Sequence, residues 1–191
     1  MENNLIKGLH VGPVLPALRT VEDFKVAMTS NISPSVVLLF GDINILPELL
    51  AQAKQSQKRI LLHLDLFEGI GKDKAGIKYL ARMGITAIIT TKTHLAKLAR
   101  AEGMIVIQRL FIMDSESIKT AINMVRSFKP DAIEILPASV PGWVVESLNR
   151  ELGLPILAGG LIHDSTEVQE TLQKGVAVVT TNRRELWNMK L

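Results

Sequence analysis

The sequence repeats one unit along its length: a helical pattern, then Gly or Pro, then a short apolar run, then polar residues. Four of the apolar runs directly follow glycines suited to the left-handed position after a helix, namely Gly84, Gly103, Gly153 and Gly175. The runs are short and rich in β-branched residues, as in parallel strands buried on both faces. The repeat therefore predicts strands that alternate with helices in a parallel sheet.

Eight apolar runs qualify as strands. They are His10–Leu18, Val36–Phe40, Ile60–Leu66, Ile85–Ile89, Met104–Ile107, Ala132–Leu136, Leu154–Leu157 and Val176–Val179. Eight strand–helix units predict a TIM (β/α)₈ barrel, compact for its 191 residues and forming a single domain over residues 1–191. The alternative is an open doubly wound sheet, which usually carries a Gly-rich turn after its first strand, and no such turn is present.

Composition excludes several classes of protein. No stretch of about 18 apolar residues occurs, and the N-terminus lacks a basic region followed by an apolar one, so we expect neither a membrane span nor a signal peptide. The chain has no cysteine, which removes disulfides, thiolate nucleophiles and Cys-ligated metals. We expect a cytoplasmic protein, and the sequence leaves homo-oligomer formation open.

The net charge of +3 and the aromatic content of 4% neither require nor exclude nucleic-acid binding. One local feature favours it. Lys74, Lys78 and Arg82 recur every four residues and predict a basic stripe along one helix face, which Lys72, Lys97 and Arg100 would enlarge. Such a stripe either binds a nucleic-acid backbone or is an ordinary solvated surface.

Chemistry in a (β/α)₈ barrel takes place where the strands end. The residues at these ends form an unusually polar set: Arg19, Asp42, His63, Asp65, Thr90, Thr91, Lys92, Gln108, Arg109, Glu134, Gly159, Gly160, Thr180 and Thr181. Among them, no group of His and carboxylates has the spacing of a metal site.

The last two strand ends have the strongest signal. Gly159-Gly160 and Thr180-Thr181 each close an apolar run, and about one strand–helix unit separates them. In barrels of this kind, the loops after the last two strands often bind phosphate through backbone N–H groups. Glycines allow close approach of the backbone, and threonine hydroxyls add donors. The pair predicts a small phosphorylated ligand, whether substrate or signal.

Two further strand ends carry ionisable groups. His63 and Asp65 are two residues apart and are expected on one strand face, either binding ligand hydroxyls, acting as a base with its orienting carboxylate, or filling the barrel as an internal pair. Glu134 lies within the apolar run Ala132–Leu136 and needs a partner, for which Arg109 is the natural candidate. That pair is either structural, ligand-binding, or both.

Five of these segments together resemble the glycerol-uptake operon antiterminator family of bacteria, over about Pro13 to Trp187. They are Pro16-Ala17-Leu18-Arg19, His63-Leu64-Asp65-Leu66, Gln108-Arg109-Leu110-Phe111, Ile133-Glu134-Ile135-Leu136-Pro137 and Ala158-Gly159-Gly160-Leu161-Ile162. The resemblance implies a barrel-shaped regulator that senses glycerol 3-phosphate and acts on leader mRNA to prevent premature transcription termination. It implies no catalysis and no cofactor. Ala138 departs from the family pattern, which favours Gly after the Leu-Pro step.

The residue pattern and the resemblance together give one ligand site for glycerol 3-phosphate, with Lys74, Lys78 and Arg82 as candidates for RNA contact. The ligand residues are Arg19, His63, Asp65, Gln108, Arg109, Glu134, Gly159, Gly160, Thr180 and Thr181.

Two alternatives remain. One is a lyase, isomerase or phosphodiesterase acting on a small phosphate ester, with His63, Asp65 and Glu134 as acid–base groups and Lys92 as electrophile or Schiff base. The other is a sensor that works through a protein partner rather than through RNA.

Overall fold

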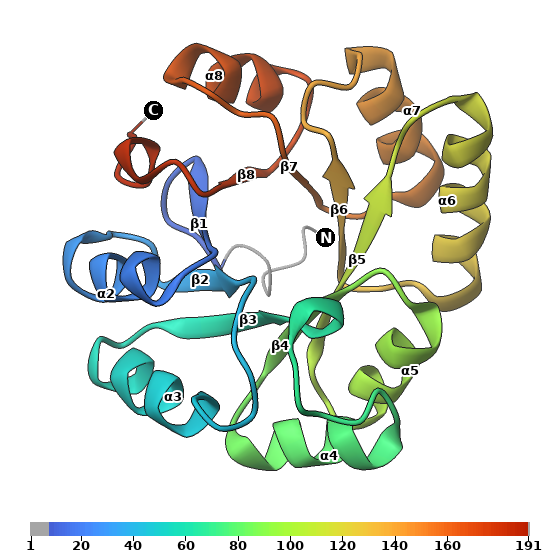
Figure 1. Ribbon diagram of the computed structural model, residues 1–191. Coiled ribbons are helices and arrows are strands. Elements are labelled where there is room, and N and C mark those ends of the chain that lie inside the picture. The colour runs from blue at the N-terminus through green and yellow to red at the C-terminus, as the bar shows by residue number, and fades with distance from the viewer. Residues whose placement is uncertain (1–7, 191) are drawn as a thin grey trace.

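The computed structural model describes residues 8–190, and its eight parallel strands close into a barrel in sequence order (Figure 1). The strands are β1 (Val14–Leu18), β2 (Ser35–Leu38), β3 (Arg59–His63), β4 (Ala87–Thr90), β5 (Ile105–Phe111), β6 (Ala132–Leu136), β7 (Ile156–Gly159) and β8 (Val178–Thr181). β8 pairs with β1, so the barrel has no free sheet edge. The predicted TIM-barrel fold is confirmed.

Helices surround the strands (Figure 1). They are α2 (Val21–Ser30), α3 (Leu46–Gln55), α4 (Lys74–Met83), α5 (Thr93–Ala101), α6 (Ser115–Phe128), α7 (Gly142–Leu152) and α8 (Ser165–Gln173), with short 3₁₀ helices at Leu64–Leu66 and Arg184–Leu186. In the described part of the chain, none of them has the length and apolar character that crossing a membrane requires.

Each of the eight predicted strands exists, but several begin later than the sequence pattern indicates. Gly84 and Gly153 end their helices in the left-handed conformation, as expected, yet β4 and β7 start three residues further on. The chain uses those residues to return from the helix end to the sheet. β7 and β8 also end two residues beyond their predicted limits, at Gly159 and Thr181.

Thr or Asp side chains cap the first turns of α2, α6 and α8. Thr20 and Asp23 form a capping box, and Asp114 accepts from the N–H of Ser117. Asp164 accepts from the N–H of Glu167, but the Glu167 carboxylate binds the N–H of His163 instead of closing a box. The 3₁₀ helix Arg184–Leu186 begins after Arg183 and has no side-chain cap.

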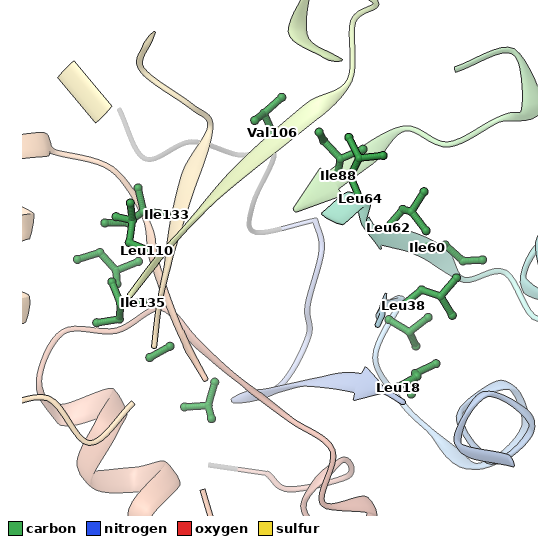
Figure 2. Packing of buried hydrophobic residues seen from close by; sticks show 14 of the residues in the cluster. Leu18, Leu38, Ile60, Leu62, Leu64, Ile88, Val106, Leu110, Ile133 and Ile135 are labelled. Carbon is green, nitrogen blue, oxygen red and sulfur yellow. The ribbon is translucent and has the colours of Figure 1, made fainter. Parts of the chain in front are cut away.

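The core forms two apolar clusters because successive strand residues face opposite ways. One fills the barrel interior and includes Leu15, Leu61 and Leu157. The other lies between the strands and the helices; Figure 2 shows part of it, with Leu38 and Ile135 among its members. Because apolar side chains occupy the middle of the barrel, polar groups can gather only at its two ends.

Candidate functional site: a polar cavity at the carboxyl ends of the strands

A small cavity of about 80 Å³ opens at the carboxyl ends of β1, β2 and β5–β8. Its lining residues are Ala17, Arg19, Leu39, Arg109, Glu134, Leu136, Gly160, Leu161, Ile162, Thr180, Thr181 and Asn182. The lining therefore includes both predicted phosphate loops and the predicted Arg109–Glu134 pair.

Glu134 is the buried charge at the base of this cavity, with no exposed surface. Its Oε2 accepts from Arg109 Nε at 2.7 Å, and its Oε1 accepts from Thr180 Oγ1 at 2.7 Å. Arg109 and Glu134 lie opposite each other in the β5–β6 register, which brings the two side chains together. Both carboxylate oxygens are thus satisfied, as a buried carboxylate requires.

Arg109 pairs with Glu134 through one of its three guanidinium nitrogens. Only its Nε binds Glu134, and the terminal Nη1 and Nη2 groups donate to no other described residue. The guanidinium also lines the cavity. Guanidinium is a strong, fork-shaped donor to phosphate oxygens. Pairing with Glu134 and binding an anion are therefore compatible roles for this side chain.

The loop after β7 supplies backbone donors. Gly160 and Leu161 both have left-handed backbones, with φ of 79° and 59°. The N–H groups of Gly160, Leu161 and Ile162 donate no hydrogen bond to another residue within 8–190. Consecutive unpaired N–H groups in such a turn form a site suited to anions.

Six of the ten predicted ligand residues line the cavity, and four do not. The six are Arg19, Arg109, Glu134, Gly160, Thr180 and Thr181. The four others are Gly159, His63, Asp65 and Gln108. Asn182 also lines the cavity, although the sequence pattern does not predict it as a ligand residue; its position directly after Thr180-Thr181 is the available signal.

The prediction that Asp65 shares a strand face with His63 is wrong. β3 ends at His63, and Asp65 lies in the 3₁₀ helix Leu64–Leu66, where the period-two alternation no longer applies. The Asp65 carboxylate accepts three hydrogen bonds, from Thr90 Oγ1 at 2.6 Å and from the N–H and Oγ1 of Thr91 at 2.7 Å each. Burial alone would raise the pKa of Asp65, but these hydrogen bonds outweigh it and lower the pKa. Asp65 therefore links the 3₁₀ helix after β3 to the turn before α5 by hydrogen bonds.

His63 and Gln108 are buried polar groups with unused hydrogen-bonding capacity. Neither ring nitrogen of His63 has a partner among the described residues, so the internal His63–Asp65 pair, one of the three alternatives, is not hydrogen-bonded. Burial, together with the nearby Arg109 charge, lowers the pKa of His63 to about 4, so the ring is neutral at pH 7. Gln108 Nε2 donates to the Thr90 carbonyl at 3.0 Å, while its Oε1 is unpaired.

The structure also shows the surroundings of Ala138 and Lys92. Ala138 is buried, its N–H donates to Gly160 O at 3.3 Å, and its φ is not left-handed, so the backbone there does not require Gly. Lys92 is exposed at the start of α5 and does not line the cavity.

Gly159 shapes the site from outside the cavity. A Cβ at this position would lie 2.1 Å from Thr180 Oγ1 and 3.0 Å from the Thr180 carbonyl oxygen. Gly159→Ala is therefore expected to displace Thr180, break its bond to Glu134 and lower the free energy of unfolding by about 2–4 kcal/mol. Urea unfolding measures the change.

A double-mutant cycle checks the mechanism. Thr180→Ala removes the atom that the new methyl group would strike, so Gly159→Ala should cost clearly less in that background. Gly142→Ala is the matched control, because its Cβ would meet only Lys174 Cγ, at 3.6 Å. If Gly159→Ala lowers the free energy of unfolding equally in the wild-type and Thr180→Ala backgrounds, this contact is not the cause.

The fold and cavity define a class: a (β/α)₈ barrel whose last two strands end at a small polar cavity suited to an anion. Comparison with known proteins narrows the class. The model of the glycerol-3-phosphate responsive antiterminator family matches residues 14–187. The uncharacterized protein YgcP of Escherichia coli (strain K12) is 32% identical over 189 residues, covering 97% of this chain and 96% of YgcP.

Two solved structures of antiterminator proteins are also similar to this chain. The glycerol uptake operon antiterminator regulatory protein of Listeria monocytogenes has a TM-score of 0.85 and 30% identity, over 91% of this chain and 94% of that protein. An antiterminator-related protein of Thermotoga maritima has a TM-score of 0.83 and 26% identity, over 93% and 99%. The chain belongs to the glycerol-3-phosphate responsive antiterminator family.

Proposed function

We propose that this protein senses glycerol 3-phosphate and, with the ligand bound, binds leader mRNA of glycerol-utilisation genes and prevents premature transcription termination. The observation that carries the proposal is the cavity itself. It combines unpaired backbone N–H groups after β7, the free end of the Arg109 guanidinium and the buried carboxylate of Glu134.

These groups suit the two ends of the ligand. The phosphate would accept from the N–H groups of Gly160–Ile162 and from Arg109 Nη atoms. The glycerol hydroxyls would lie toward Glu134 and Thr180, whose side-chain oxygens can accept hydrogen bonds from them. Arg19 and Asn182 lie in the same lining and would complete the enclosure.

The geometry favours binding over turnover. Glu134 already accepts from Arg109 and Thr180, and Asp65 accepts from Thr90 and Thr91, so neither carboxylate is a free base. Lys92 is exposed and outside the cavity lining. Among residues 8–190, no group of three or more His, Asp and Glu side chains is placed to hold a metal ion.

The decisive measurement is leader-RNA affinity with and without the ligand. A ligand that binds the RNA-competent state more tightly shifts the protein toward that state. Saturating glycerol 3-phosphate is expected to tighten RNA binding by about 5–150-fold, which corresponds to about 1–3 kcal/mol of coupling. Glycerol and inorganic phosphate, each added alone, are the matched controls.

Occupancy is monitored independently by thermal unfolding. Ligand at 100 times its Kd stabilises the folded state by about 2.7 kcal/mol. Occupied protein whose RNA affinity does not change would contradict the coupling. Release of phosphate or conversion of the ester would favour the enzyme instead. A ligand-dependent partner that is still bound after RNase treatment would favour the sensor that works through a protein.

A further inference from the structure

Charge is distributed unevenly along this chain. Residues 46–100, from α3 through α5, contain ten Lys and Arg and four Asp and Glu, a net charge of +6. The whole chain carries only +3, so the remaining residues sum to −3. α3, α4 and α5 occupy one sector of the barrel, in the lower part of Figure 1. The protein therefore has a strongly basic sector although its overall net charge is modest.

Six exposed cations of this sector form what we call the basic face. They are Lys54, Arg59, Lys74, Lys78, Arg82 and Lys97. Within residues 8–190, none of the six has an ion-pair partner. Two predicted members of the stripe differ: Lys72 donates to the Leu64 and Phe67 carbonyls, and Arg100 pairs with Asp131.

The carboxylates of the sector do not neutralise this face. Asp65 is bound by the threonines of the β4–α5 turn, and Asp73 accepts from the N–H of Gly76. The exposed Glu48 and Glu68 lie in the first turn of α3 and in the segment after β3, both toward the carboxyl end of the barrel. Within residues 46–100, the half of the face toward the amino end therefore carries positive charge alone; Glu102, at the end of α5, lies just beyond this range.

A hollow of about 590 Å³ lies at this amino end, between α3, α4 and the starts of β2 and β3. Its charged lining residues are Lys54, Lys58 and Arg59, and no carboxylate is among the lining. Lys58 Nζ is fixed by the carbonyls of Asn31 and Ser33, each at 2.7 Å. Ser35 also lines the hollow, and its buried Oγ has no described partner. These groups suit an anion.

The α4 stripe leads into this hollow. Four residues advance an α-helix by about 6 Å, so Lys74, Lys78 and Arg82 form a row along α4. Arg82 precedes Met83 and Gly84, which both line the hollow. Tyr79, the only tyrosine of the chain, is 42% exposed on the same helix. An exposed ring beside cations can stack on an unpaired base.

We propose that the basic face and its hollow hold the RNA backbone, with Tyr79 stacked on an unpaired base; this inference rests on the proposed function. A polyanion that follows the row on α4 would place successive phosphates against Lys74, Lys78 and Arg82 and seat one in the hollow. The stacking ring favours RNA over an acidic protein as the partner. The surface lies outside the ligand cavity, so ligand and RNA can be bound together.

The test neutralises three members of the face: Lys54→Gln, Lys78→Gln and Arg82→Gln in one protein. Binding is measured by fluorescence anisotropy with the leader transcript of the glycerol-utilisation genes of the source bacterium, in saturating glycerol 3-phosphate over a range of salt. Losing three phosphate contacts is expected to weaken binding about 100-fold at 0.15 M salt. The slope of log K against log salt should become shallower by about 2–3.

The matched control removes the same number of charges elsewhere, with Lys25→Gln on α2, Lys119→Gln on α6 and Arg150→Gln on α7. Both triple variants should keep thermal stabilisation by glycerol 3-phosphate. If the two triple variants bind RNA equally, the basic face is overturned and the proposed function stands. If wild-type protein binds no leader transcript in saturating ligand, both the RNA-binding role of the basic face and the proposed function are wrong. A partner that survives RNase treatment and is lost only from the first variant would be an acidic protein and would overturn the RNA assignment.

Discussion

Glu134→Ala is expected to lower the free energy of unfolding by about 3–5 kcal/mol. The substitution leaves the Arg109 guanidinium without its carboxylate and removes the acceptor of Thr180 Oγ1. Arg109 retains only 10% side-chain exposure, so water compensates little for the lost partner. Urea unfolding measures the loss, and calorimetric titration should also show weaker glycerol 3-phosphate binding, since the ligand loses a hydroxyl acceptor.

A double variant separates structure from recognition. Glu134→Leu with Arg109→Met replaces the buried pair by apolar side chains of similar size, which is often neutral or stabilising. We expect stability to return toward wild type while ligand binding stays weaker than in the wild type. A double variant that binds glycerol 3-phosphate normally would show that the pair is structural only. The exposed Arg126–Glu151 pair is the matched control, and Glu151→Ala should cost less than about 1 kcal/mol.

The sequence pattern predicts the barrel well because each unit repeats the same physical signals. Glycines such as Gly84 and Gly153 end helices in the left-handed conformation, and the apolar runs after them can only be buried strands. It predicts the strand limits less well, because a helix-ending glycine marks where the helix stops and not where pairing begins. β5 also extends to Phe111, four residues past the predicted end, through polar residues such as Arg109.

The candidate site was predictable where one physical demand forces one answer. A carboxylate in an apolar run requires a cation, and Arg109 is opposite Glu134 in the sheet register. Asp65 was misplaced because a 3₁₀ turn after a strand has no composition that separates it from a longer strand. The unpaired N–H groups after Gly159 depend on two successive left-handed residues, one of them Leu161, which no propensity indicates.

His63 is expected to make the protein sensitive to mild acid. Its pKa is about 4 in the folded protein and about 6.5 in an unfolded chain, so the unfolded state binds the proton first as pH falls. Stability should therefore be constant above about pH 7 and fall by up to about 3 kcal/mol between pH 6.5 and 4. The pKa values of Asp23 and Asp65 are lowered in the folded protein, so the stability that these two carboxylates contribute is lost only in more acid solution, as pH falls below the ordinary carboxyl value of 3.8. Urea unfolding at half-unit pH steps resolves the two windows.

His63→Leu tests the same residue for structure and for ligand recognition. Removing two buried, unpaired ring nitrogens should raise stability at pH 7 by about 1–3 kcal/mol and abolish the decline between pH 6.5 and 4. The exposed His94 on α5 is the control, and His94→Gln should keep the decline. A persistent decline in His63→Leu would assign it to another group. Because His63 carries unsatisfied nitrogens near Arg109, we expect the stabilised variant to bind glycerol 3-phosphate more weakly. Unchanged affinity would make His63 a filler of the barrel interior instead.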